Sequence, residues 1–306
     1  MAETGGQRKV GDTPLWLRLA PAIFLLFWSA GFAFLKMGLA HAAPLTFLAL
    51  RYALVLAVLA PLFVVLRPPL PRSRAAWGHL AAIGILIQAL YFGLISVAIE
   101  RGLSAGGAAL IASLQPILVA LLVPWFAGER VSARRWVGLG FGCLGATLVI
   151  VARSTVEATS TLSVLFAVGA LASITAGTLY EKRFGVAHHP VTSNLVQYAI
   201  AFAATLPAAW AFEDLRVTWT GELFVALGYL VIANSLISMT LLLAMIRHGE
   251  AARVSALFFL VPPTAALIAW AVIGEAMPVL AWAGTALAAL GVALATKQAR
   301  APAKRP

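Results

Sequence analysis

One basic residue, Arg51, lies well inside a long apolar segment of this 306-residue chain. Charged side chains at such a depth are usually paired with another polar group or take part in function. A guanidinium donates hydrogen bonds in a planar fork that matches a carboxylate, so Arg51 is a candidate contact for the carboxylate of a solute. In the structural alternative, the long side chain reaches back to the end of its segment near Pro44, about two helical turns away, and keeps its charge in water.

Two amides deep in apolar segments form a second candidate group, since Gln88 and Asn234 are separated by 146 residues. An amide in hydrocarbon is unfavourable unless it is hydrogen-bonded, so each one either joins another helix or meets solute and water. At helical spacing each amide shares a face with other residues: Tyr91, Phe92 and Ser96 for the first, and Ser238 and Leu241 for the second. Such faces, part aromatic and part polar, suit a zwitterion with an apolar side chain.

Prolines in corresponding positions form a third group, because Pro116 and Pro262 are also 146 residues apart. A proline inside a membrane helix frees a backbone carbonyl, which is tolerated where it faces a cavity or a neighbouring helix. The prolines therefore indicate a central site, and inherited structural kinks are the alternative. Ser113, Phe258 and Phe259 share helical stripes with these prolines, although a stripe at this spacing also arises from ordinary packing.

Trp28 and Tyr180 complete the set, because an aromatic side chain with a polar edge can both stack and form hydrogen bonds. Tyr180 lies near the end of its segment, where it would serve equally well as an interfacial anchor. The predicted substrate-binding residues are Trp28, Gln88, Tyr91, Phe92, Ser113, Pro116, Tyr180, Asn234, Ser238, Phe258, Phe259 and Pro262, with Arg51 as the carboxylate contact.

Composition places these residues in a membrane protein. Hydrophobic residues make up 62% of the chain, charged residues only 11%, and the mean hydropathy is +0.95. Soluble domains are about half apolar and a quarter charged, so the composition excludes a water-soluble globule. The formal charge of +11 does not indicate a nucleic-acid partner, because the basic residues occur in short runs between apolar stretches.

Ten apolar stretches are long enough to cross a bilayer, which takes about 20 residues of helix. Short polar or proline-containing breaks separate them. The sequence therefore predicts an all-α integral membrane protein with ten transmembrane helices, near residues 16–36, 44–66, 77–99, 103–126, 134–152, 162–180, 192–212, 222–245, 251–273 and 277–296.

Lysine and arginine are distributed unequally between the predicted loops. Of the 22 basic residues, 17 lie in the N-terminal segment, in every second loop and in the C-terminal segment, whereas four lie in the other loops. Short cytoplasmic loops of membrane proteins are enriched in these residues. The bias predicts that both termini are cytoplasmic and that the number of spans is even.

The two halves of the sequence resemble each other at a shift of 146 positions, without a gap from Gly31 onward. The matches include residue types that chance rarely pairs: Lys36 with Lys182, Pro44 with Pro190, Tyr52 with Tyr198, Pro116 with Pro262 and Trp136 with Trp282. We therefore expect two homologous repeats of five helices, residues 1–152 and 153–306. Because five is odd, the second copy must enter the membrane from the opposite side, as in secondary transporters that work by alternating access.

The paired ends of the two halves resemble the drug/metabolite transporter superfamily with two EamA-type repeats. Gln115-Pro116, Gly128-Glu129 and Gly138 in the first half, and Val261-Pro262, Gly274-Glu275 and Gly284 in the second, give this resemblance, which covers nearly the whole chain. It implies a ten-helix basket with a central cavity in the bacterial inner membrane, exporting amino acids or other metabolites. Phe27-Trp28-Ser29 and Arg51-Tyr52 are similar to the aromatic amino-acid exporters of that superfamily, whose other members move nucleotide sugars, sugar phosphates, purines and drugs.

Other classes of protein fit the sequence less well. An intramembrane enzyme needs juxtaposed nucleophiles, carboxylates or histidines, and the sequence contains no such set, so we expect no enzymatic activity. Cys143 is the single cysteine, and the five histidines have no ligand-like spacing, so no metal or cofactor is predicted. A channel is the remaining alternative, and it would conduct without saturable exchange.

Small residues on the fifth and tenth segments predict how the bundle is held together. Gly138 and Gly142 on one segment, and Gly284 and Ala288 on the other, form faces that permit close helix packing. We expect these two helices to pack on each other within a monomer. The expected partners are thus the lipid bilayer and a small-molecule substrate, with no nucleic acid.

Overall fold

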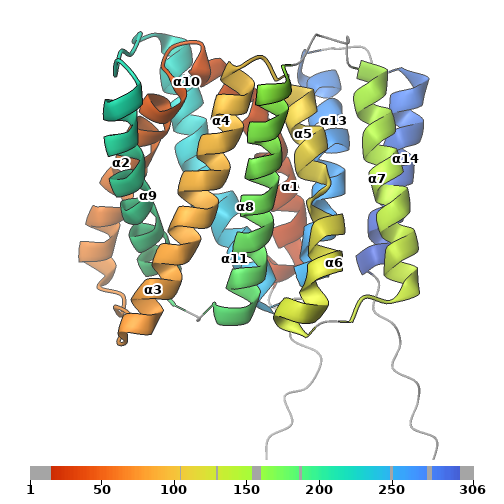
Figure 1. Ribbon diagram of the computed structural model, residues 1–306, viewed down its shortest axis with the longest axis horizontal. Helices are drawn as coiled ribbons and strands as arrows, with labels where there is room; N and C mark the ends of the chain where they lie inside the picture. Colours follow the sequence, from red (N-terminus) through yellow and green to blue (C-terminus); the bar gives the residue numbers. More distant parts are fainter. Residues whose placement is uncertain are drawn as a thin grey trace, which may run out of the picture.

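The structure, a computed structural model, describes residues 15–103, 105–128, 130–153, 160–185, 188–248, 251–273 and 278–296. Within these ranges the chain forms a bundle of helices with roughly parallel axes and contains no strand (Figure 1). The predicted all-helical fold class is confirmed.

The first half contains five helical segments, two of which are composite. In chain order they are α1 (Leu15–Leu39); α2 (Pro44–Leu66); α3 (Arg74–Ile83), which continues through the π-helix η1 (Gly84–Tyr91) into α4 (Phe92–Glu100); α5 (Ala105–Ser113) with α6 (Gln115–Ala127); and α7 (Ala133–Arg153).

The second half has the same order of elements. They are α8 (Thr161–Phe184); α9 (Pro190–Phe212); α10 (Gly221–Tyr229), which continues through the π-helix η2 (Leu230–Ser238) into α11 (Met239–His248); α12 (Ala251–Ser255) with the 3₁₀ helix η3 (Ala256–Leu260) and α13 (Val261–Ile273); and α14 (Val279–Thr296).

The element boundaries repeat at the shift found in the sequence. Both ends of α9 lie 146 residues after the ends of α2, and both ends of α13 lie 146 residues after those of α6. The π-helix η2 also begins 146 residues after η1. A π-helix is rare and needs local support, so its presence at equivalent positions favours a duplication.

Among the described residues, eight helical segments are long and apolar enough to cross a membrane. They correspond to the first four predicted spans, then to the sixth, seventh, eighth and tenth. The fifth and ninth predicted spans correspond to α7 and to the segment from α12 to α13, which lie outside these eight. The count of ten spans remains a prediction.

The fourth and ninth predicted spans are interrupted helices. Leu114 separates α5 from α6, and η3 separates α12 from α13. A proline has no N–H group, and its ring clashes with the carbonyl four residues earlier, which for Pro116 belongs to Ala112. Pro116 and Pro262 instead occupy the second position of a new helix, where the missing N–H is tolerated.

Glycines join α7 to α14, which lie side by side at one edge of the bundle (Figure 1). A Cβ atom added to Gly138 would lie 2.7 Å from the Gly291 carbonyl oxygen, and one added to Gly145 would lie 2.6 Å from that of Gly284. Only glycine permits this backbone approach, so the predicted packing of these two segments is confirmed. The order of the contacts shows that the two helices are antiparallel.

We expect Gly145→Leu to destabilise the protein by at least about 1–3 kcal/mol, because the new side chain would overlap the backbone of α14. Gly140→Leu is the matched control on the same helix, since a Cβ there meets nothing within 4 Å. Thermal unfolding in detergent tests the difference. Equal unfolding temperatures for the two variants would contradict the assigned interface.

Candidate functional site

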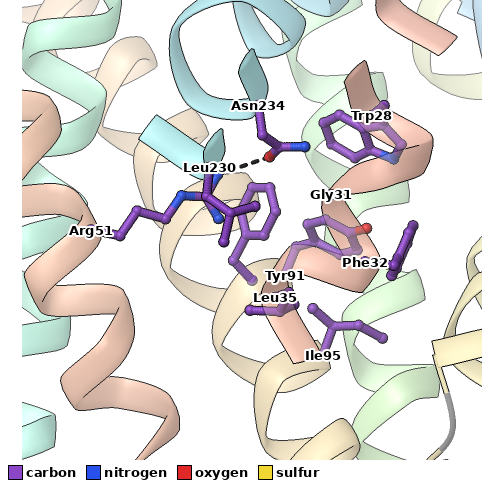
Figure 2. Close-up of a pocket in the computed structure, with 10 residues that line it drawn as sticks. Trp28, Gly31, Phe32, Leu35, Arg51, Tyr91, Ile95, Leu230 and Asn234 are labelled. Carbon is purple, nitrogen blue, oxygen red and sulfur yellow. Dashed lines mark hydrogen bonds between the residues drawn. The ribbon is translucent and has the colours of Figure 1, made fainter. Parts of the chain in front are cut away.

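Arg51 is fully buried and forms the polar centre of the site (Figure 2). Its Nη2 donates a 2.8 Å hydrogen bond to Asn234 Oδ1, and its Nε donates a 2.9 Å hydrogen bond to Ser235 Oγ. The guanidinium carbon lies 4.6 Å from the ring centroid of Phe92, within cation–π range. Nη1 has no hydrogen-bond partner among the described residues.

A small cavity lies beside this guanidinium. Residues from α1, α2, η1, α4 and η2 line it: Trp28, Gly31, Phe32, Leu35, Arg51, Tyr91, Phe92, Ile95, Leu230 and Asn234. Its free volume is about 20 Å³, little more than a water molecule occupies. A larger solute can enter only if side chains or helices move.

Aromatic rings surround the cavity. Trp28 is stacked with Tyr91 at a centroid distance of 6.3 Å and lies 6.0 Å from Phe92. Phe258 meets the edge of Trp28 at 5.6 Å, and Phe24 lies 5.2 Å from the same indole. Apart from the Arg51 and Asn234 side chains and the tyrosine hydroxyl, the lining is therefore apolar or aromatic.

The π-helical geometry of η2 brings two adjacent side chains to Arg51. In a π-helix each N–H bonds to the carbonyl five residues earlier, so the turn is wider than in an α-helix. Tyr198 on α9 donates a 3.1 Å hydrogen bond to the Ser235 carbonyl within this turn. Tyr52 on α2, the counterpart of Tyr198, donates to the Gln88 carbonyl in η1, one position away from the strict counterpart of Ser235. Two tyrosines from corresponding helices thus stabilise the two π-helices.

Gly31 allows Asn234 to approach α1. A Cβ atom added at Gly31 would lie 2.6 Å from Asn234 Nδ2. The absence of a side chain at this position is therefore what permits the orientation in which the amide oxygen accepts from Arg51.

Five of the predicted site residues line the cavity: Trp28, Arg51, Tyr91, Phe92 and Asn234. Phe258 lies behind Trp28, in contact with its edge. Gln88 is fully buried, but neither amide atom has a hydrogen-bond partner within the described ranges. It is not among the residues that line the cavity.

The other predicted residues lie elsewhere in the core. Ser113 and Ser238 donate hydrogen bonds to carbonyls of their own helical segments. The Phe259 ring packs against Gly142 of α7. Tyr180 pairs with His79 through a 2.8 Å hydrogen bond near the end of α8. Pro116 and Pro262 are buried at the starts of their helices.

Sequence reasoning missed five cavity residues: Gly31, Phe32, Leu35, Ile95 and Leu230. Phe32 and Leu35 follow Trp28 at four and seven residues, Ile95 follows Tyr91 at four, and Leu230 precedes Asn234 at four. Extending each predicted polar or aromatic face by one helical turn would have found them.

The repeat gives the Arg51–Asn234 contact a neutral counterpart. At the shift of 146 residues, Arg51 corresponds to Gln197 and Asn234 corresponds to Gln88. Both glutamines are fully buried, and their amide groups have no hydrogen-bond partner in the described parts of the chain. Only one of the two equivalent positions on α2 and α9 therefore carries a charge.

Polar contacts close the bundle at its two ends. At one end the Glu213 carboxylate accepts hydrogen bonds from the backbone N–H groups of Leu45 (2.8 Å) and Thr46 (2.7 Å), at the start of α2. At the other end Arg247 Nε lies 2.9 Å from the buried carboxylate of Glu181. Burial and the Arg247 charge lower the pKa of nearby His188, which keeps that side chain neutral at pH 7.

The described residues include no group of three histidine, cysteine or acidic side chains that could hold a metal ion. The site consists of a cationic donor, whose Nη1 has no hydrogen-bond partner in the described residues, beside an aromatic cavity.

Known proteins resemble this chain over nearly its full length. The uncharacterized inner membrane transporter YedA of Escherichia coli K12 is 24% identical over 287 residues, covering 92% of this chain and 91% of YedA. The uncharacterized transporter YvbV of Bacillus subtilis 168 is 23% identical over 281 residues, with the same coverage of each chain. A probable amino-acid metabolite efflux pump of Escherichia coli K12 is 24% identical over 281 residues, covering 88% of this chain and 91% of the pump.

A crystal structure that is 19% identical superposes with a TM-score of 0.75, covering 92% of this chain and 97% of that chain. At this identity the likeness shows a shared fold. The expected similarity to aromatic amino-acid exporters in particular stays a prediction.

The EamA-like transporter family matches the sequence twice, at residues 16–151 and 161–297. This chain is therefore a multi-pass membrane transporter that belongs to the EamA-like transporter family.

Proposed function

We propose that this transporter exports aromatic and other neutral amino acids, or closely related metabolites, across the bacterial inner membrane. The main support is the buried Arg51 guanidinium, which presents an unpartnered Nη1 beside a cavity of aromatic and apolar side chains. The relative described as an amino-acid metabolite efflux pump supports the direction and the class of solute. YedA, a relative described as an inner membrane transporter, supports the location.

The chemistry of the site matches the parts of such a solute. The carboxylate accepts a charge-assisted hydrogen bond from Arg51 Nη1. The faces of Trp28 and Tyr91 provide a surface for an apolar or aromatic side chain, and aromatic faces also attract an ammonium group. Asn234 and Ser235 hold the guanidinium in place and leave this donor free.

Transport proceeds by alternating access of two inverted repeats, residues 1–152 and 153–306, with both termini in the cytoplasm. The antiparallel packing of α7 on α14 supports inversion, because these helices are equivalent under the repeat. The polar contacts of Glu213 and of Glu181 with Arg247 lie at opposite ends, where gates are required. The small cavity volume matches a solute-free, closed arrangement.

A nucleoside or sugar phosphate is the alternative solute class. A phosphate dianion would favour more than one cation, whereas Arg51 is the single cationic residue among those that line the cavity. The lining therefore favours a monoanionic carboxylate. A counterflow screen in proteoliposomes separates the classes: exchange of phosphorylated compounds with no exchange of neutral or aromatic amino acids would overturn the proposal.

Arg51→Gln is expected to weaken exchange of tryptophan and phenylalanine about tenfold to a hundredfold, since a hydrogen bond to a charged group contributes roughly 1.5–3 kcal/mol. Glutamine already occupies the equivalent buried position, Gln197, so its size suits the site. The measurement is the half-saturation concentration for counterflow.

The decarboxylated amines of the same amino acids serve as control solutes. If Arg51 contacts the carboxylate, the variant loses most of the discrimination between each amino acid and its amine. Unchanged discrimination in a folded, inserted variant would exclude the carboxylate contact while leaving the transporter class intact.

Gly31→Ala is expected to reduce amino-acid exchange by about tenfold, because the added methyl group displaces Asn234 and with it the Arg51 guanidinium. Gly93→Ala, on α4, is the matched control, since its Cβ would meet only Leu45 at an ordinary 3.9 Å. Exchange rates are compared at equal amounts of reconstituted protein. Equal rates for the two variants would show that the position of Asn234 does not matter for transport.

A further inference from the structure

A second and larger cavity opens between α2, the start of α3 and α9. Its volume is about 510 Å³, within the range of roughly 300–1,000 Å³ that is usual for ligand pockets. The lining is apolar throughout and includes Phe63, Leu70, Trp77, Gly78 and Ile200. These helices lie together at one edge of the bundle in Figure 1, and the groove shares no lining residue with the cavity beside Arg51.

Three exposed arginines are close in sequence to lining residues of this groove. Arg67 and Arg72 are in or next to the loop that contributes Leu70 to the lining, and Arg74 begins α3, which contributes Trp77 and Gly78. None of them takes part in an ion pair within the described chain. An apolar groove of this size with free positive charge at one end matches a molecule with an apolar chain and an anionic head.

The loop that presents these arginines is rigid. Pro68, Pro69 and Pro71 restrict its backbone. Thr192 of α9 donates a 3.2 Å hydrogen bond to the Pro69 carbonyl, and the Trp77 indole donates one of 3.1 Å to the Pro71 carbonyl. Preorganised charges bind a ligand with less loss of entropy than flexible surface arginines do.

The repeat shows that the groove is specific to one end of the molecule. At the shift of 146 residues, the three arginines correspond to Glu213, Thr218 and Thr220, and Gly78 corresponds to Phe224. The corresponding loop of the second half has a single arginine, Arg216, whose Nε lies 4.0 Å from Asp214, and a phenyl ring stands where the first half has no side chain. Shared ancestry alone does not explain the combination of groove and arginines.

We propose that this groove binds one anionic phospholipid, with an acyl chain along the apolar lining and the phosphate at Arg72 and Arg74. Basic pockets between helices, at the level of the headgroups, are suited to anionic lipids, to which each nearby basic side chain adds affinity. The Trp77 ring, half exposed and hydrogen-bonded by its N–H, lies where tryptophan prefers the interface between chain and headgroup. The site is separate from the solute cavity, so it does not depend on the identity of the solute.

The test uses the full chain in detergent, titrated with phosphatidylglycerol or with phosphatidylcholine of the same acyl chains. Native mass spectrometry counts the bound lipids, and thermal unfolding measures the stabilisation. We expect one tightly retained phosphatidylglycerol per chain and at least roughly tenfold weaker retention of phosphatidylcholine.

Two variants separate the headgroup contact from the chain contact. Arg72→Ala with Arg74→Ala removes the charge, and Gly78→Phe adds a phenyl ring to the groove at a position where the Cβ atom meets nothing within 4 Å. Both are expected to weaken phosphatidylglycerol retention roughly tenfold or more. Arg130→Ala with Arg134→Ala is the charge-matched control, which removes two other exposed arginines and retains the lipid.

Three results would overturn the proposal. The first is equal loss of retention in the control double variant, which would indicate non-specific attraction by net charge. The second is unchanged retention by folded Gly78→Phe, and the third is equal retention of both lipids. A dimer that forms through this face and disappears in Gly78→Phe would instead identify a second copy of the chain as the occupant.

Discussion

The burial of one guanidinium constrains the structure around the centre of the bundle. A charge removed from water is unfavourable unless its hydrogen-bonding groups are satisfied, and arginine stays protonated at any accessible pH. Arg51 therefore requires the Asn234 amide, the Ser235 hydroxyl and the face of Phe92. These requirements extend to the neighbouring helices. Asn234 takes this position against α1 because residue 31 is a glycine, and the wide turn of η2 brings the side chains of both Asn234 and Ser235 to the guanidinium. The remaining donor, Nη1, has no hydrogen-bond partner in the described residues, and the proposed function assigns the solute's carboxylate to it.

Duplication explains most of the architecture, and departures from it mark where the halves differ in chemistry. Equivalent tyrosines, Tyr52 and Tyr198, stabilise equivalent π-helices, and glycines on α7 and α14 pack in antiparallel register. Arg51 and Gln197 break this equivalence at the centre, as the arginines near Pro68 do at one end. A repeat protein with two identical halves would present the same surface to both sides of the membrane. These few substitutions make the two halves chemically different at the centre and at one end of the bundle.

Helix boundaries were predictable because the internal repeat and the prolines determine where helices begin. Arg51 and Asn234 were recognisable because polar groups are rare in hydrocarbon. Gln88 lies within the π-helix Gly84–Tyr91, whereas its predicted face was drawn at α-helical spacing, so its place in the site stays a prediction. The sequence does not distinguish the surroundings of Phe258 from those of Phe259, because adjacent residues can both lie near one helix stripe. The two differ in the structure because the Phe259 ring packs against Gly142 of α7. The hydrogen-bond partner of Tyr180 is His79, which is distant in sequence and which no local sequence pattern identifies.

The contacts of α2 with α9 determine which parts of the protein can move as one body. The Glu213 carboxylate, at the end of α9, holds the start of α2, and Thr192 near the start of α9 holds the loop that follows α2. A rearrangement that keeps these bonds must carry both helices together, although one belongs to each half of the sequence. The rigid units of such a movement therefore combine helices from both halves of the sequence, and neither half moves as one body by itself. A hinge between them would fall in the interrupted helices near Leu114 and Ala256, where regular α-helical hydrogen bonding gives way to a turn and to a 3₁₀ helix.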